Sequence, residues 1–155
     1  MKRAADTHDL ADRTLDLRFS VPHPGVSEGR SLLVEMKQMT LQVESNAEAP
    51  GRSRSLLAEM KSSLEPRYDD VLLVVSELVT NSVRHSDTKG IDVKVETGDH
   101  RIRVEVSDDG PGFTIETPRG DGMGLSLVDK LSEDWGLTSS DRFTVWAELS
   151  RSHSR

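Results

Sequence analysis

The segment IDVKVETGDHRIRVEV, residues 91–106, contains two short runs in which apolar and polar side chains alternate. Such alternation is typical of strands that bury one face, and the Gly98-Asp99 pair between the runs suits a tight turn. The apolar positions are Ile91, Val93 and Val95 in the first run and Ile102, Val104 and Val106 in the second. The segment therefore predicts a β-hairpin, and with it a sheet with one buried face.

Helical and strand patterns continue on both sides of this hairpin. Pro50 and Pro66 each open a predicted helix upstream, and a helix over 123–131 and a hairpin of 134–137 with 143–149 are predicted downstream. The helix after Pro66 has one recurring face, made of Val71, Val75, Leu78, Val79 and Ser82. The sequence thus predicts an α/β (α+β) two-layer sandwich, with helices on one face of a mixed, mostly antiparallel sheet.

Residues 1–39 form a separate N-terminal extension in this interpretation. Alternation over 15–21 predicts a strand, and a helix is predicted over 27–38. The segment RSLLVEMK at 30–37 nearly repeats RSLLAEMK at 54–61. The repeat is open to three explanations: a duplicated strand and helix that adds an edge strand, an arm for dimer contacts, or an untranslated segment if Met36 or Met39 is the true start.

Size and charge exclude several classes of function. A chain of 155 residues suffices for one domain with a single core, and 34% hydrophobic with 30% charged residues is a globular composition. A net charge of −7 argues against direct nucleic-acid binding, because phosphate contacts need a basic surface. The absence of cysteine excludes disulfides and thiolate metal sites. No apolar run reaches the roughly 18 residues of a membrane span, and residues 1–12 lack the centre of a signal peptide, so we expect a cytoplasmic protein without a membrane partner.

Three polar residues form a row on the helix predicted after Pro66. Glu77 and Asn81 are four residues apart, so they project from the same face, and His85 continues the row. A carboxylate at this position can accept a proton, while an amide oxygen is a hard ligand that suits Mg²⁺. A merely polar helix face explains these residues equally simply when they are considered alone.

Two glycine-containing segments follow. SDDGPGF at 107–113 comes directly after a strand; Asp108 can accept a hydrogen bond from the amine of adenine, and the glycines allow close approach of backbone to a base. GDGMGL at 120–125 opens a helix whose free N–H groups can hold phosphates. An ordinary turn and a packing requirement are the respective alternatives. The second segment lacks the Gly-Lys-Ser/Thr ending of a Walker loop.

Taken together, the three segments resemble the GHKL ATPases, the Bergerat-fold family of gyrase, Hsp90, histidine kinases and MutL. The shared order is an acid and amide on a helix, an aspartate-glycine loop after a strand, and a glycine pair before a helix. The resemblance implies a GHKL ATP-binding domain over 40–150 with the Bergerat fold, followed by a disordered tail at 151–155. Within the family, the segments most similar to bacterial serine-kinase anti-sigma factors are VVSELVTNSVRHS (74–86), GLSLVDKL (124–131) and FTVWAEL (143–149).

The resemblance assigns roles by position. It implies that Glu77 is the general base, that Asn81 is the Mg²⁺ ligand and that Asp108 reads adenine. His85 is implied to lie near the phosphates, and Thr144 to support adenine from a late strand. The remaining ATP-binding positions implied are Gly110 and Gly112 in the first glycine box, and Gly122, Met123, Gly124 and Leu125 in the second.

The activity implied is that of an ATP- and Mg²⁺-dependent serine-protein kinase of the anti-sigma factor type. Such a protein phosphorylates a STAS-type anti-anti-sigma partner and sequesters a sigma factor, with a homodimer as a further expectation. The alternative is a nucleotide-gated protein-binding module without kinase activity. Phosphoryl transfer to a serine of the partner distinguishes the two hypotheses.

Overall fold

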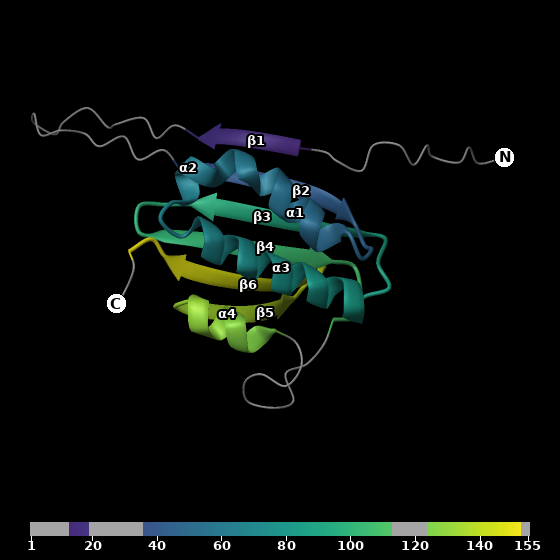
Figure 1. The fold of residues 1–155 in the computed structure, drawn as a ribbon. Coiled ribbons are helices and arrows are strands. Elements are labelled where there is room, and N and C mark those ends of the chain that lie inside the picture. The colour runs from purple at the N-terminus through teal and green to yellow at the C-terminus, as the bar shows by residue number, and fades with distance from the viewer. Residues whose placement is uncertain (1–12, 19–35, 113–123, 153–155) are drawn as a thin grey trace, which may run out of the picture.

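The computed structural model describes residues 13–18, 36–112 and 124–152, and its centre is a six-stranded sheet. The strand order is β1-β2-β3-β4-β6-β5, and every neighbouring pair is antiparallel (Figure 1). The strands are β1 (Arg13–Arg18), β2 (Met36–Glu44), β3 (Gly90–Thr97), β4 (Arg101–Asp108), β5 (Asp134–Ser139) and β6 (Phe143–Ser150). The hairpin predicted from 91–106 is confirmed as β3 and β4, at the centre of the sheet.

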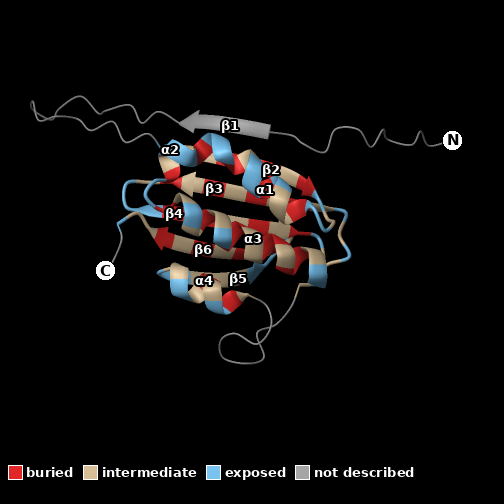
Figure 2. Cartoon of the chain, viewed as in Figure 1, coloured by how far each residue is buried: buried red, intermediate tan, exposed pale blue. Residues whose placement is uncertain are grey.

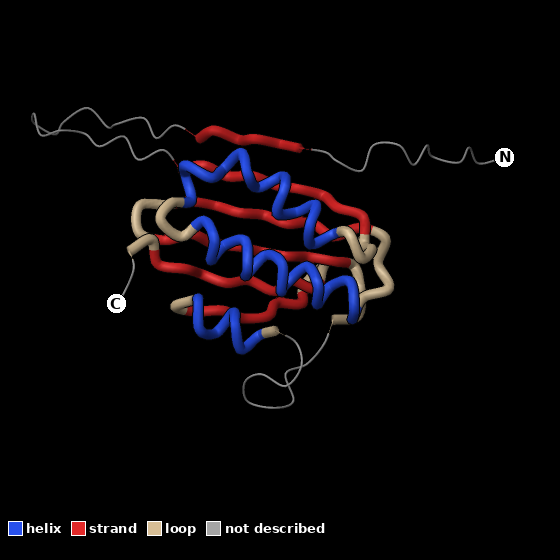
Figure 3. The backbone as a smooth tube through the Cα atoms, viewed as in Figure 1, coloured by secondary structure: helices blue, strands red, loops and turns tan. Residues whose placement is uncertain are grey.

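The helices form a second layer on one face of the sheet (Figures 1 and 3). The longest, α3 (Tyr68–His85), packs over β3 and β4 and carries two acidic residues in its first turn, where they favour the positive end of the helix dipole. Beside it lie α1 (Ala49–Leu57), the short 3₁₀ helix η1 (Ala58–Met60), α2 (Lys61–Leu64) and α4 (Leu125–Leu131). The predicted two-layer α/β sandwich is therefore confirmed.

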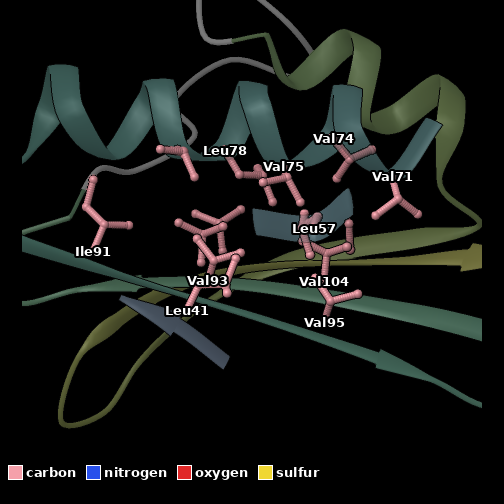
Figure 4. Packing of buried hydrophobic residues seen from close by; sticks show 14 of the residues in the cluster. Leu41, Leu57, Val71, Val74, Val75, Leu78, Ile91, Val93, Val95 and Val104 are labelled. Atoms are coloured by element: carbon pink, nitrogen blue, oxygen red, sulfur yellow. The ribbon is translucent and has the colours of Figure 1, made fainter. Parts of the chain in front are cut away.

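The core lies between these two layers. Strands β3, β4 and β6 bury every second residue (Figure 2), and the buried ones belong to the same core cluster as the buried residues of the helices. Val71, Val75 and Leu78 on α3 meet Val93 and Val104 on the sheet (Figure 4). Burial of each such side chain away from water contributes roughly 1.5–3 kcal/mol to the stability of the folded state. This packing holds α3 firmly against the sheet and thereby fixes the polar row on its other positions.

A buried arginine ties together the ends of three elements. Arg67, which precedes α3, donates from Nη1 to the carbonyl of Ser150 and from Nη2 to the carbonyl of Leu131, each at 2.8 Å. Its Nε also bonds the Asp70 carboxylate at 2.6 Å. Because only 11% of the Arg67 side chain is exposed, these bonds are shielded from water, so α3, the end of α4 and the end of β6 are linked by one guanidinium.

The N-terminal region differs in part from its prediction. The helix expected over 27–38 is wrong at its end, because residues 36–38 belong to β2, in which Lys37 and Gln38 pair with β3. Residues 19–35 lie outside the described part of the chain. The strand expected over 15–21 corresponds to β1, an edge strand that ends at Arg18. The expectation of a mixed sheet is also corrected, since no parallel pair occurs among the described strands.

Candidate functional site

The polar row predicted on α3 is present. Asn81 is 2% exposed, and its Nδ2 is buried without a hydrogen-bond partner among the described residues. Glu77 lies one turn earlier and is half-buried, whereas His85 ends the helix and is exposed. An unpaired buried amide costs free energy unless another group satisfies it. The position of Asn81 is therefore suited to a ligand and poorly explained by packing alone.

Asp108 ends β4 and is buried beside α3. It is 4% exposed; its Oδ2 accepts a hydrogen bond from the Ser82 hydroxyl, and its Oδ1 accepts one from the Gly110 N–H at 2.8 Å. A buried carboxylate is tolerated when donors satisfy it in this way. The sequence predicts Ser82 only as a member of the mostly apolar face of α3, and it does not predict the contact of Ser82 with Asp108. The structure thus brings Asp108 to the helix that carries Glu77 and Asn81.

The first glycine loop passes close to the end of α3. A Cβ added to Gly110 would lie 2.8 Å from Cβ of Ser86, the residue that caps α3, and 2.9 Å from Oδ1 of Asp108. Gly112 has φ +73° and leaves no room for a Cβ against the Phe143 ring. Any side chain at either position would push the loop away from α3 and β6.

The second glycine segment meets Glu77. Gly124 precedes α4 with φ +66°, and a Cβ there would collide with the Glu77 carboxylate, reaching 2.8 Å from its Cδ. Leu125, the first residue of α4, is buried in the core. Gly122 and Met123, predicted in the same segment, lie outside the described residues. Gly124 and Glu77, 47 positions apart in the sequence, are thus in direct proximity.

We expect Gly124→Ala to lower any activity of this site about tenfold. A left-handed backbone costs a non-glycine residue roughly 1–2 kcal/mol, and the new methyl group would displace the Glu77 carboxylate. Phosphoryl-transfer rates and thermal unfolding of both proteins provide the measurement. Gly98→Ala is the matched control, because the nearest atom to its Cβ is 3.6 Å away. An unchanged rate in Gly124→Ala would show that the contact with Glu77 has no functional importance.

Arg142, whose role is not predicted from the sequence, holds the first glycine loop. Its Nε bonds Asp109 at 2.7 Å, and its Nη1 bonds the Asp92 carboxylate on β3. Partial burial opposes ionisation of Arg142, but hydrogen bonds and charge from Asp92 and Asp109 outweigh it and raise the pKa of the guanidinium. Arg142 therefore stays charged and links the loop to the sheet. Ion pairs between distant positions leave no local pattern in a sequence, so this one could not be predicted.

The structure does not bring Thr144 to this site. The side chains of β6 alternate between faces, and Thr144 bonds Ser107 at 2.7 Å on the face away from the helices. Asp108 and Phe143, which are cross-strand neighbours, both lie on the helix-facing side. The role of Thr144 in supporting adenine stays a prediction, and Phe143 is the β6 residue paired with Asp108.

The donors around Asn81 fit a magnesium ion that is held mainly by a nucleotide. Among the described residues, no group of three or more histidine and acidic side chains forms a metal site. Mg²⁺ commonly takes one or two protein oxygens, with substrate phosphates and water completing its coordination. Asn81 carries one such oxygen, Oδ1, while its orphaned nitrogen Nδ2 is a donor that suits a nucleotide oxygen. Over the same residues, no helix has both the length and the apolar character needed to span a bilayer.

Comparisons with known proteins agree with this geometry. Residues 67–153 match the family described as histidine kinase-, DNA gyrase B-, and HSP90-like ATPases. The chain is 28% identical over 131 residues to the serine-protein kinase RsbW of Listeria monocytogenes serotype 4a, covering 70% of this chain and 83% of that protein. It is 27% identical over 129 residues to the serine-protein kinase RsbW of Staphylococcus epidermidis, covering 68% and 81% respectively.

Proposed function

Because this chain belongs to the family of histidine kinase-, DNA gyrase B- and HSP90-like ATPases, we propose that it is an ATP-dependent serine-protein kinase of the anti-sigma factor type. The observation that carries the proposal is the convergence of the two glycine-containing segments on α3: Gly124 meets Glu77, and Asp108 meets Ser82, the residue after Asn81. The similarity to two proteins named serine-protein kinase RsbW supports the choice of a serine acceptor.

The reaction transfers the γ-phosphoryl group of ATP to a serine hydroxyl. The serine oxygen forms a bond to the γ-phosphorus, the bond from that phosphorus to the β,γ-bridging oxygen breaks, and ADP leaves. Glu77 accepts the proton of the attacking hydroxyl. Asp108 accepts a hydrogen bond from the 6-amino group of adenine, and Asn81 would supply a ligand to Mg²⁺. Binding of the phosphates is assigned to Gly122, Gly124 and His85. Bound Mg²⁺ would neutralise phosphate charge.

The acceptor that we propose is a STAS-type anti-anti-sigma protein. Phosphorylation of that antagonist leaves the kinase free to bind a sigma factor, so ATP controls which partner is held. The protein acts in the cytoplasm, where ATP and Mg²⁺ are available, and a homodimer is part of the proposal. The test is transfer of labelled γ-phosphate from ATP to a serine of a purified STAS partner. Nucleotide-dependent partner binding without any transfer would instead identify a nucleotide-gated binding module.

We expect Asn81→Ala to lower the Mg²⁺-dependent affinity for ATP about tenfold, because one neutral oxygen ligand among several is lost. Calorimetric titration of the full chain with ATP, with and without Mg²⁺, measures the effect. Asn46→Ala is the matched control. It removes an asparagine outside the proposed site, where Oδ1 of Asn46 accepts a hydrogen bond from the Glu48 N–H at 2.9 Å in the loop before α1. Equal Mg²⁺ dependence in wild type and Asn81→Ala would remove Asn81 from the metal site.

A further inference from the structure

The Ser82 hydroxyl holds one oxygen of the carboxylate to which the proposed function assigns recognition of the base. Ser82 is 5% exposed and Asp108 is 4% exposed, so the hydrogen bond between them is shielded from water. The Gly110 N–H donates to the other oxygen of the same carboxylate at 2.8 Å. One donor thus comes from a helix and the other from the loop, and together they fix the plane of the carboxylate.

The orientation of Asp108 matters because purines differ at their 6-position. Adenine carries an amino group there, which donates hydrogen bonds, whereas hypoxanthine and guanine carry a carbonyl oxygen, which accepts them. A buried carboxylate with fixed orientation accepts a bond from the amino group and disfavours the carbonyl, because two acceptors facing each other remain unsatisfied. A carboxylate free to rotate in the same pocket would lose part of this discrimination.

We propose that Ser82 is a positioning residue that makes the site selective for 6-aminopurine nucleotides over 6-oxopurine nucleotides. The inference rests on the proposed function, in which Asp108 contacts adenine. Ser82 acts through Asp108 and does not need to touch the nucleotide. Since Ser82 follows Asn81 on α3, one rigid helix carries the proposed base, the proposed metal ligand and the group that orients the adenine-reading acid.

Binding of ATP and of ITP to the full chain, each with Mg²⁺, tests this inference. ITP has a carbonyl at the 6-position and the same ribose and phosphates. For Ser82→Ala, we expect ATP affinity to fall roughly tenfold and ITP affinity to change less than about twofold, because only the contact at the 6-position is weakened. In the kinase assay, the KM for ATP should rise while kcat at saturating ATP stays near the wild-type value, since Glu77 is unaltered.

Two further variants keep the test decisive. Ser53→Ala removes another buried serine hydroxyl, which donates to the Ala49 carbonyl at 2.9 Å on α1, and should leave the ATP-to-ITP ratio unchanged. Ser82→Cys has a similar shape but a weaker donor, so a ratio between those of wild type and Ser82→Ala is expected even if the alanine variant does not fold.

The possible failures have different signatures. An ATP-to-ITP ratio in Ser82→Ala and Ser82→Cys equal to that of wild type would overturn the inference alone. An equal loss of affinity for both nucleotides would also overturn it, because it would reveal a purely structural role. If wild type bound neither nucleotide, the proposed function itself would fail, and the role of Ser82 would fail with it.

Discussion

Replacing Glu77 by glutamine is expected to reduce phosphoryl transfer to the acceptor serine by about 10²–10⁴-fold, the usual contribution of a general base. Glutamine has nearly the shape of glutamate but cannot accept a proton from the attacking hydroxyl. The contact of Gly124 with this side chain leaves no space for a larger group, so the isosteric change is the appropriate one. Single-turnover transfer of labelled phosphate to a STAS protein gives the rate directly.

Nucleotide affinity provides the control for this prediction. Because Glu77 is not assigned a contact with adenine, ATP should bind Glu77→Gln within about twofold of wild type, and the loss should fall on kcat. Asp134→Asn is a matched charge-removing variant on β5, an edge strand of the sheet, and should transfer phosphate normally. Transfer that persists at the wild-type rate in Glu77→Gln would exclude this carboxylate as the base.

Asp108→Asn is expected to weaken ATP binding by about 10- to 150-fold, the equivalent of a charge-assisted hydrogen bond of roughly 1.5–3 kcal/mol. The carboxylate receives bonds from Ser82 and Gly110, so an amide NH₂ at this position must face one of these donors or the nucleotide. An amide that turns its NH₂ toward the base favours a 6-carbonyl, so the ratio of ATP affinity to ITP affinity should fall toward one or below it.

Calorimetry with both nucleotides measures this change, and thermal unfolding shows whether the buried substitution alters the fold. Asp99→Asn is the control, because Asp99 is exposed in the β3–β4 turn, at the opposite end of β4 from Asp108. Identical ATP affinity in wild type and a folded Asp108→Asn protein would be incompatible with adenine recognition by this residue.

The sequence predicts the central fold well because periodicity carries that information. Alternation fixes the faces of β3 and β4, and the helical recurrence of Val71, Val75 and Leu78 identifies the buried side of α3. The same principle limits the prediction at residues 36–38. Apolar and polar residues there suit a helix locally, but pairing with the neighbouring strands β1 and β3 supplies backbone hydrogen bonds that only the folded sheet can offer.

For the candidate site, the sequence predicts which residue types are present but not all of their directions. The proximity of Gly124 to Glu77 agrees with the order of the motifs. The family resemblance implies that Thr144 supports adenine, but it does not fix the face on which this side chain lies, because a shift of one residue along a strand reverses the face. The structure gives the helix-facing place to Phe143, whose ring lies under Gly112. Contacts between distant residues, such as Ser82 with Asp108, have no signature in local spacing.

The hydrogen bonds of Arg67 also bear on how far α4 can move. Arg67 fastens the Leu131 end of α4 to the start of α3, while the other end of α4 begins at Gly124 beside Glu77. Leu125 anchors that second end in the core, so α4 is held at both ends. The spacing between Gly124 and the proposed base is therefore expected to be set by the fold before any nucleotide binds.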